Sequence, residues 1–359
     1  MKQAKNFTVL IFLLLYAFSI KGQQILEHNY DNLDKALKKD FRSGFGFSVL
    51  VGDEKKILFN KSYGYIDLLK TKSTNERTLF NIASISKSIT TIGIMRLIEQ
   101  NKLNLTDTLG KFFSNVPSDK RTITISNLLC HKSGFQQNYV CDGKINSNEA
   151  LQALLADTLG SIAGTNFDYS NQNFEMLALV IEKIANTTYE AFIRKEILSP
   201  LKMKNTYFWD EVRSFKNVAE KNRTISDSIM MRNWGYIGSG GIYSTSTDLY
   251  KFMNGVIQNR LISKSSLQLL FSEYHKTKSG LGIGYGWFIN DTTEWSSKEI
   301  WTRGNEDWGH NAVIRWFTDK KKIIIVCTNS GEISGDKQVT GNRLISNYIA
   351  DYLWKREQN

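Results

Sequence analysis

Ser84 and Lys87 form the pair in this chain whose types and spacing best suit nucleophilic chemistry. A serine hydroxyl is a weak nucleophile that needs a neighbouring base. On a helix, residues three apart share a face, and a buried lysine there could accept the serine proton. The Ser-x-x-Lys pattern is weak alone, since two other segments match it in turn-like contexts beside proline or glycine. The alternative interpretation is a helix N-terminal serine followed by an exposed lysine.

A second candidate group, Tyr169-Ser170-Asn171, follows 85 residues after the serine. A hydrogen-bonded phenol could carry a proton between nucleophile and leaving group, and the asparagine amide could hold a substrate carbonyl. Residues 30–32 match the same Tyr-x-Asn pattern. Tyr169 could therefore instead be a core aromatic residue just before a helix.

The elements that must position these residues follow from hydrophobic periodicity. β-Like runs occur near both ends of the chain, at 45–51, 56–63, 78–83, 299–303, 312–318 and 322–329. Helical spacing occurs at 30–41, from Ile85 to about 101, and at 173–185, 189–198, 246–257 and 343–356. We expect an α/β (α+β) fold, in which an antiparallel sheet flanked by helices is built from both termini. The sheet domain would span about 25–83 and 295–359, and a mainly helical domain would be inserted at about 84–294.

Four segments in order resemble those of the serine β-lactamase and penicillin-binding protein superfamily. Residues 78–88 are similar to its nucleophile segment, and residues 123–134, 240–249 and 282–287 to its "LLTHTSG", "GGLYST..DL" and "YGYGW" segments. The Ser-x-Ser-Lys and Tyr-x-Asn forms resemble the class C branch, with its D,D-peptidase and esterase relatives. The resemblance covers about residues 30–355 and implies a β-lactamase/transpeptidase-like fold.

The resemblance implies a role for each motif residue. Ser84 would be the acylated nucleophile, Lys87 and Tyr169 would activate it and protonate the leaving group, and Asn171 would contact the substrate. The oxyanion hole would use the backbone N–H groups of Ser84 and Asn305.

The third motif of the family departs from its usual form here. Thr302-Arg303-Gly304 stands where Lys-Thr-Gly or His-x-Gly is usual, so we expect Thr302, Gly304 and Asn305 to line the substrate site without that cation. Arg303 could supply a charge, but strand alternation directs its side chain away from Thr302. The departure argues against efficient β-lactam hydrolysis. His131, in the second segment, is expected to be structural, and His310 is a weaker site candidate.

Composition sets the broad class. The 359 residues carry a net charge of +11, with 41% apolar and 23% charged residues, which is typical of a globular protein. No Lys/Arg cluster is interleaved with aromatic residues, so we expect no nucleic-acid partner. Four histidines and three cysteines lack metal-ligand spacing, and we expect neither metal nor cofactor. A Cys130–Cys141 disulfide is possible, whereas Cys327 fits a buried strand.

The N-terminus indicates export. Lys2 and Lys5 precede an apolar run at 7–20, which is typical of a secretory signal over residues 1–22. The mature domain would be 23–359, periplasmic or secreted, with no stable membrane span. An uncleaved N-terminal anchor is the alternative.

The leading hypothesis is a serine hydrolase acting through a Ser84 acyl-enzyme. Its small-molecule or peptide substrate would be an ester or amide: a cell-wall or D-amino-acid peptide, a small ester or, less favoured, a β-lactam. A catalytically weak penicillin-binding or sensor protein on the same fold is the alternative. A third hypothesis, based only on the charge, is a binder of anionic envelope polymers.

Overall fold

The computed structural model describes residues 30–41, 45–220, 233–306, 309–330 and 341–355. It divides into two compact units, residues 1–44 and 45–359. In the first unit, residues 30–40 are helical, as the spacing of apolar residues predicts. The predicted signal at 1–22 lies outside the described residues. Within the described ranges, none of the helices combines the length and apolar character needed to cross a membrane.

The second unit is built on an eight-stranded antiparallel sheet in the order β2-β1-β11-β10-β9-β8-β7-β6. The strands are β1 (Phe47–Asp53), β2 (Ile57–Tyr63), β6 (His275–Lys276), β7 (Gly282–Ile283), β8 (Phe288–Asn290), β9 (Glu299–Asn305), β10 (Asn311–Phe317) and β11 (Lys322–Thr328). The antiparallel sheet drawn from both ends of the chain is thus confirmed. Three strands, β6 to β8, precede residue 295, so the sheet also recruits residues that we assigned to the helical insertion.

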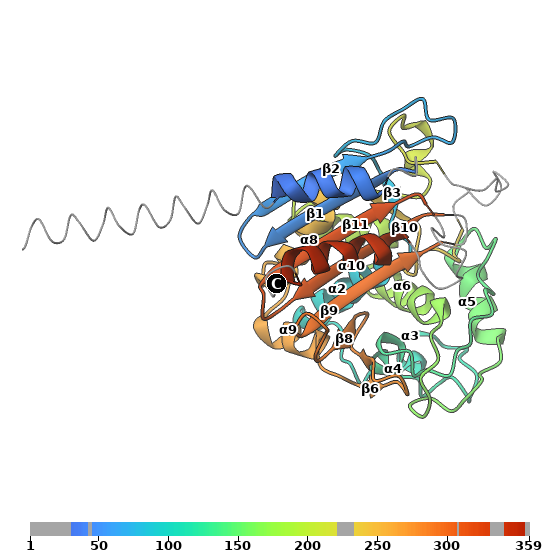
Figure 1. Cartoon of the computed structure of the whole chain (residues 1–359). Coiled ribbons are helices and arrows are strands. Elements are labelled where there is room, and N and C mark those ends of the chain that lie inside the picture. The colour runs from blue at the N-terminus through green and yellow to red at the C-terminus, as the bar shows by residue number, and fades with distance from the viewer. Residues whose placement is uncertain (1–29, 42–44, 221–232, 307–308, 331–340, 356–359) are drawn as a thin grey trace, which may run out of the picture. The chain divides into compact units, whose positions relative to one another are not determined.

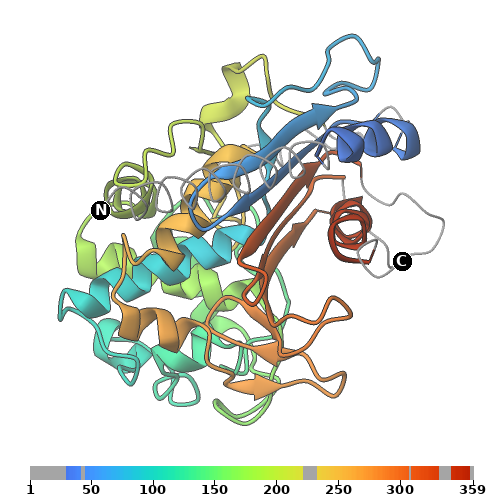
Figure 2. The same ribbon diagram turned by 60° about the vertical axis from the view of Figure 1, so that its left-hand side comes forward.

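Helices cover both faces of this sheet (Figures 1 and 2). α10 (Gly341–Trp354) packs on β10 and β11 from one side, and α2 (Ile85–Glu99) and α8 (Ser246–Ile257) pack on the other. Because side chains alternate along a strand, alternate residues of β11 join the core that contains α2 and α8. The pattern Ile-Ile-Ile-Val-Cys along β11 is apolar throughout because both faces of the strand are buried.

The middle of the second unit is mainly helical, with a small second sheet. Its helices are α3 (Leu109–Phe112), α4 (Ile125–Leu129), α5 (Ser147–Ala156), α6 (Asn171–Ala185), α7 (Tyr189–Ile193), α9 (Lys264–Leu270), a π-helical turn (Arg194–Leu198) and a 3₁₀ turn (Glu211–Ser214). The three-stranded sheet has the order β3 (Phe80–Asn81), β5 (Ile242–Ser244) and β4 (Tyr207–Phe208). β3 is short, but it fixes where the chain enters α2.

All three cysteines are free, buried thiols, so the possible Cys130–Cys141 disulfide is not formed. The Cys130 thiol donates to the Ser126 carbonyl at 3.1 Å, and the Cys141 thiol donates to the Ala150 carbonyl at 3.8 Å. Each of these two thiols is thus satisfied by a neighbouring carbonyl rather than by the other sulfur. Burial raises the pKa of Cys130 to about 11, which keeps it protonated and unreactive at neutral pH.

Candidate active site

Ser84 stands where a strand turns abruptly into a helix. It occupies the position before the first residue of α2, three residues after the last residue of β3. Ala83 has a φ of 45°, a conformation that an alanine rarely adopts, and its N–H donates to the Asn81 side chain at 2.8 Å. The Ile82 N–H is held by the Ile242 carbonyl of the small sheet. Such backbone strain typically costs about 1–3 kcal/mol and clusters at functional sites.

Lys87 connects the candidate residues to one another. Its side chain is buried, and its Nζ donates to Ser84 Oγ at 2.8 Å, to Asn171 Oδ1 at 2.8 Å and to the Ser239 carbonyl at 2.9 Å. The Ser84 hydroxyl can donate to or accept from this nitrogen, whereas the two carbonyl oxygens can only accept. The same nitrogen lies 5.1 Å from the centre of the Tyr169 ring. The structure therefore brings together the four residues that the two sequence motifs predict.

Tyr169 and Asn171 are held by the start of α6. The Ser170 side chain accepts the N–H of Gln172 and caps this helix. The His131 ring lies 4.4 Å from the Tyr169 ring, and its Nδ1 accepts the Ser170 N–H at 3.2 Å. Burial lowers the pKa of His131 to about 3, and the charge of Lys87 is the next largest cause of the decrease. The imidazole is therefore neutral. Its contacts are those of a platform for Tyr169, as expected for a structural histidine.

Gly304 allows β9 to approach the nucleophile turn. A Cβ at this position would lie 2.0 Å from the Ile82 carbonyl oxygen and 2.7 Å from the Ser84 nitrogen. The next hydrogen-bonded pair of the β9–β10 ladder is Glu306 N–H to His310 C=O. Because bonded and non-bonded pairs alternate in antiparallel sheets, the Asn305 N–H points away from β10. β8 pairs only as far as Trp301, so this N–H lies on the uncovered edge of β9.

Thr302 and Arg303 leave β9 on opposite faces. The Thr302 side chain is buried against α2, where its Oγ1 accepts from Ser88 Oγ at 3.0 Å. The Arg303 guanidinium lies beside the Trp301 ring, 5.7 Å from its centre. The predicted alternation is therefore present, and Arg303 does not take the place of a cation at position 302.

A narrow cavity opens at the nucleophile. It is lined by Ser84, Lys87, His131, Tyr169, Ile283, Gly284, Gly286, Trp287, Phe288, Thr302 and Arg303. Asn171 belongs to this site because its side chain accepts a hydrogen bond from Lys87. Gly304 belongs to it because it contacts the Ser84 backbone. No group of three or more His, Cys, Asp or Glu in the described ranges could hold a metal ion.

Two contacts of the site were not predicted from the sequence. The Ser239 carbonyl, in the glycine-containing segment at 235–241, accepts from Lys87, and a backbone acceptor leaves no residue-type signal. Glu175 is a fully buried carboxyl on α6, and Ser239 Oγ lies 3.5 Å from its Oε1. His310 is buried 6.0 Å from the Tyr243 ring and does not line the cavity at Ser84.

Comparison with known proteins identifies the class to which this fold and site belong. The Beta-lactamase family model matches residues 34–345, so the chain belongs to the Beta-lactamase family. Protein flp of Staphylococcus aureus (strain MW2) is 30% identical over 196 residues, which cover 52% of this chain and 39% of that protein. The chain thus matches less than half the length of this curated relative.

Solved structures agree with this class. FmtA from Staphylococcus aureus superimposes with a TM-score of 0.73 at 25% identity, covering 90% of this chain and 89% of that one. A D-amino acid amidase from Ochrobactrum anthropi SV3 gives a TM-score of 0.74 at 18% identity, covering 94% and 99%. At that identity the amidase supports the fold alone.

Proposed function

We propose that this protein is a serine hydrolase that cleaves an ester or amide through an acyl-enzyme on Ser84. The observation that carries the proposal is the 2.8 Å contact between Lys87 Nζ and Ser84 Oγ at the start of α2. The contact places a proton acceptor within hydrogen-bond reach of a hydroxyl that borders a cavity.

In the first half-reaction, Ser84 Oγ attacks the substrate carbonyl and its proton passes to Lys87 in its neutral form. The carbonyl oxygen takes the electron pair of the broken π bond, and the Ser84 and Asn305 N–H groups stabilise the resulting oxyanion. The C–O or C–N bond then breaks as Tyr169 gives its hydroxyl proton to the leaving alcohol or amine, and Lys87 passes the proton it took from Ser84 to Tyr169. In the second half-reaction, water attacks the acyl carbonyl and gives a proton to Lys87. The bond to Ser84 Oγ then breaks, the proton passes to Ser84, and the acid is released.

Asn171 is suited to hold the substrate beside this machinery. Its Oδ1 is occupied by Lys87 at 2.8 Å, which leaves its amide N–H₂ as a donor for a substrate carbonyl. We propose a cell-wall or D-amino-acid peptide, or a small ester, as the substrate class. Amide cleavage is the activity named for the D-amino acid amidase whose fold this chain shares, and we include it in the proposal on that ground. A β-lactam is less favoured, because Thr302 supplies no charge to a substrate carboxylate.

A catalytically weak penicillin-binding or sensor protein is the second candidate function. One observation favours it: Thr302, where the family usually has a cation, is an uncharged side chain buried against α2 in contact with Ser88. Such a protein would form the acyl-enzyme and fail to hydrolyse it.

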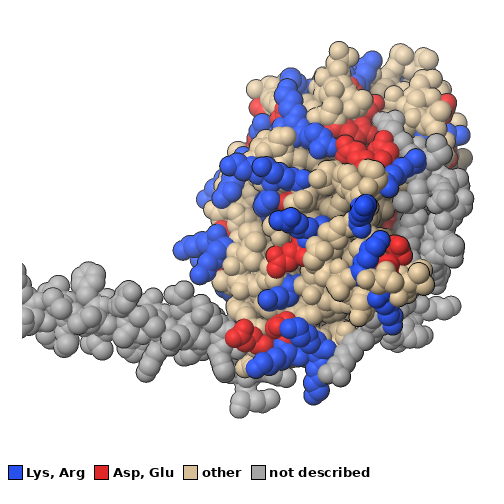
Figure 3. All heavy atoms as spheres, turned by 90° about the horizontal axis from the view of Figure 1, so that it is seen from above, with Lys and Arg blue, Asp and Glu red and all other residues tan. Residues whose placement is uncertain are grey.

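Export and the role of the basic charge are further parts of the proposal. The charged and apolar N-terminal pattern at 1–22 supports a periplasmic or secreted location. On the face drawn in Figure 3, the described Lys and Arg side chains are scattered, with acidic side chains among them. This arrangement supports solubility more than the binding of an extended anionic polymer.

The test is intact-protein mass spectrometry of the wild type, Ser84→Ala and Ser86→Ala after incubation with a fluorophosphonate, a penicillin and an activated acyl ester. Ser86 is a matched control, because it lies on the same helix and its buried hydroxyl has no hydrogen-bond partner in the described structure. We expect adducts on the wild type and Ser86→Ala but none on Ser84→Ala.

Turnover then separates the two candidate functions. Loss of an adduct with time, with release of the acid, supports the hydrolase. A stable adduct supports the weak binding protein, and no adduct on any variant would remove the acyl-enzyme mechanism.

A further inference from the structure

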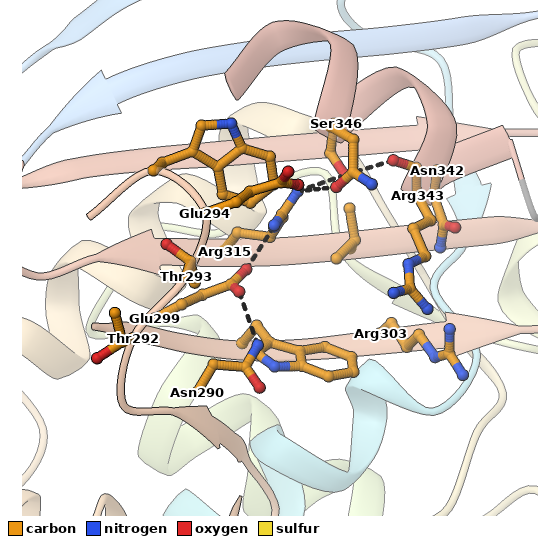
Figure 4. A pocket seen from close by; sticks show the side chains of 14 residues that line it. Asn290, Thr292, Thr293, Glu294, Glu299, Arg303, Arg315, Asn342, Arg343 and Ser346 are labelled. Atoms are coloured by element: carbon orange, nitrogen blue, oxygen red, sulfur yellow. Dashed lines mark hydrogen bonds and ion pairs between the residues drawn. The ribbon is translucent and has the colours of Figure 1, made fainter. Parts of the chain in front are cut away.

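A second cavity, of about 290 Å³, lies on the face of the sheet opposite α2, between α10 and the β8–β9 connection (Figure 4). Its floor is the outer face of β9 and β10, and its walls are the start of α10 and residues 292–295. A cavity of this size admits a small organic molecule. Neither of the two sequence motifs contributes a residue to it.

The charged residues on the floor of this cavity are already paired with each other. Arg315 bonds Glu299, and its Nη1 donates to Asn347 Oδ1 at 2.7 Å. The other oxygen of Glu299 accepts from Asn290 at 2.9 Å. At the rim, Glu294 pairs with Lys355 at 2.9 Å. Both acidic residues that line the cavity are therefore paired with cations other than Arg303 and Arg343.

Among the described residues, Arg303 and Arg343 are two cations for which the cavity supplies no counter-ion. Their side chains lie near each other in Figure 4, one from β9 and one from α10. In the described parts of the chain, neither guanidinium forms an ion pair or a side-chain hydrogen bond with a carboxylate. Burial, and then the charge of Arg343, lower the pKa of Arg303, the shift expected where like charges face each other. An anion placed between them would relieve this repulsion and accept charge-assisted hydrogen bonds.

The same cavity offers a ring surface and neutral hydrogen-bonding groups. Trp301 is partly exposed and backed by Phe288, with the two ring centres 4.6 Å apart. Asn342 and Thr293 also line the cavity. An indole face beside a guanidinium favours a ligand that has a planar or apolar body next to its negative group.

We propose that this cavity binds a small organic anion, with a carboxylate or phosphate held by Arg303 and Arg343 and a ring or apolar face against Trp301. Arg303 also lines the cavity at Ser84, and the next residue, Gly304, abuts the Ser84 backbone. A bound anion would thus contact Arg303, and the next residue of β9 abuts the proposed nucleophile.

Isothermal titration calorimetry of the full mature chain with benzoate, phenyl phosphate and uncharged benzamide tests this site. We expect saturable binding of at least one anion and none of benzamide, with the two anions distinguishing carboxylate from phosphate. Arg343→Gln, at an exposed position, should weaken binding about tenfold or more, and Arg303→Gln should do the same. Arg77→Gln, an exposed arginine elsewhere, is the control and should leave the affinity unchanged.

The position of the ligand is checked independently of any activity. Crystals soaked with 4-bromobenzoate should give an anomalous bromine peak between α10 and β9. Equal affinity in the wild type and both cavity variants, equal binding of benzamide, or a bromine peak only beside Ser84 would each overturn the proposal.

Discussion

Replacing Glu175 with glutamine should make the stability of the protein less dependent on pH. Glu175 is fully buried on α6, its Oε2 has no hydrogen-bond partner in the described structure, and its Oε1 is 3.5 Å from Ser239 Oγ. Burial raises the pKa of this carboxyl from 4.5 to about 8, and the interaction with the Cys141 thiol and then the charge of Lys87 offset only part of that effect. The carboxyl is therefore protonated in the folded protein at neutral pH.

The sign and size of the effect follow from proton linkage. Between about pH 4.5 and pH 8, the folded state keeps a proton that the unfolded state releases, so the free energy of unfolding falls as the pH rises. At about 1.4 kcal/mol per pH unit, the wild type should lose on the order of 3 kcal/mol from this group between pH 5 and pH 7 or above. Glu175→Gln keeps the shape and removes the titration. Any fixed cost of the amide would be the same at every pH.

Urea unfolding at several pH values from 5 to 8 measures this difference. The free energy of unfolding of Glu175→Gln, relative to the wild type, should increase steadily toward pH 8. Glu76→Gln, at an exposed position, should run parallel to the wild type and controls for the change in net charge. If the Glu175→Gln and wild-type curves are parallel over the whole range, the carboxyl is not buried as a neutral acid and the reasoning is refuted.

Two further substitutions and one thiol titration test the site and the core. Gly304→Ala should reduce any hydrolytic rate about 100-fold or more, because its Cβ would press on the Ile82 carbonyl and displace the Ser84 turn; unchanged steady-state kinetics would contradict the close approach. Tyr169→Phe keeps the ring against His131 and removes only the hydroxyl, so kcat should fall about 100-fold or more with little change in the melting temperature, and a retained kcat would exclude the proton-transfer role. The native protein should not react with Ellman's reagent, whereas the denatured, unreduced protein should release three thiols; one thiol would instead indicate a disulfide.

Long periodic segments were predictable from sequence, and short ones were not. The helix predicted at 246–257 is α8 with the same bounds, and the three C-terminal strands lie within two residues of their predicted limits. β6 to β8 contain only two or three residues each, too few to display a period. β1 also runs to Asp53, two residues beyond the predicted limit at 51, and the Asp53 carboxylate holds the following turn by accepting the N–H groups of Lys55 and Lys56.

The residues of the site were likewise only partly predictable from the sequence. Side-chain motifs pointed to Ser84, Lys87, Tyr169 and Asn171, and these residues meet in space although 84 residues separate the lysine from the asparagine. Burial of a carboxyl in α6 could not be inferred, because the polar residues around Glu175 in the sequence resemble a solvent-exposed face. The groups around that carboxyl come from distant parts of the chain, namely Ser239, Cys141 and Lys87.

The alternation of side chains along β9 explains what the changed third motif does to the position of the cation. Even-numbered residues of the strand face α2, so Thr302 and Gly304 lie toward the nucleophile, and odd-numbered residues face α10. The positive charge one position later in the sequence therefore belongs to the opposite face of the sheet. Arg303 nevertheless borders both cavities, so the cation lies at the boundary between them rather than at the strand position that faces Ser84. The same backbone pairing still brings the Asn305 N–H to the edge of β9, so the loss of the usual cation leaves this backbone donor in place.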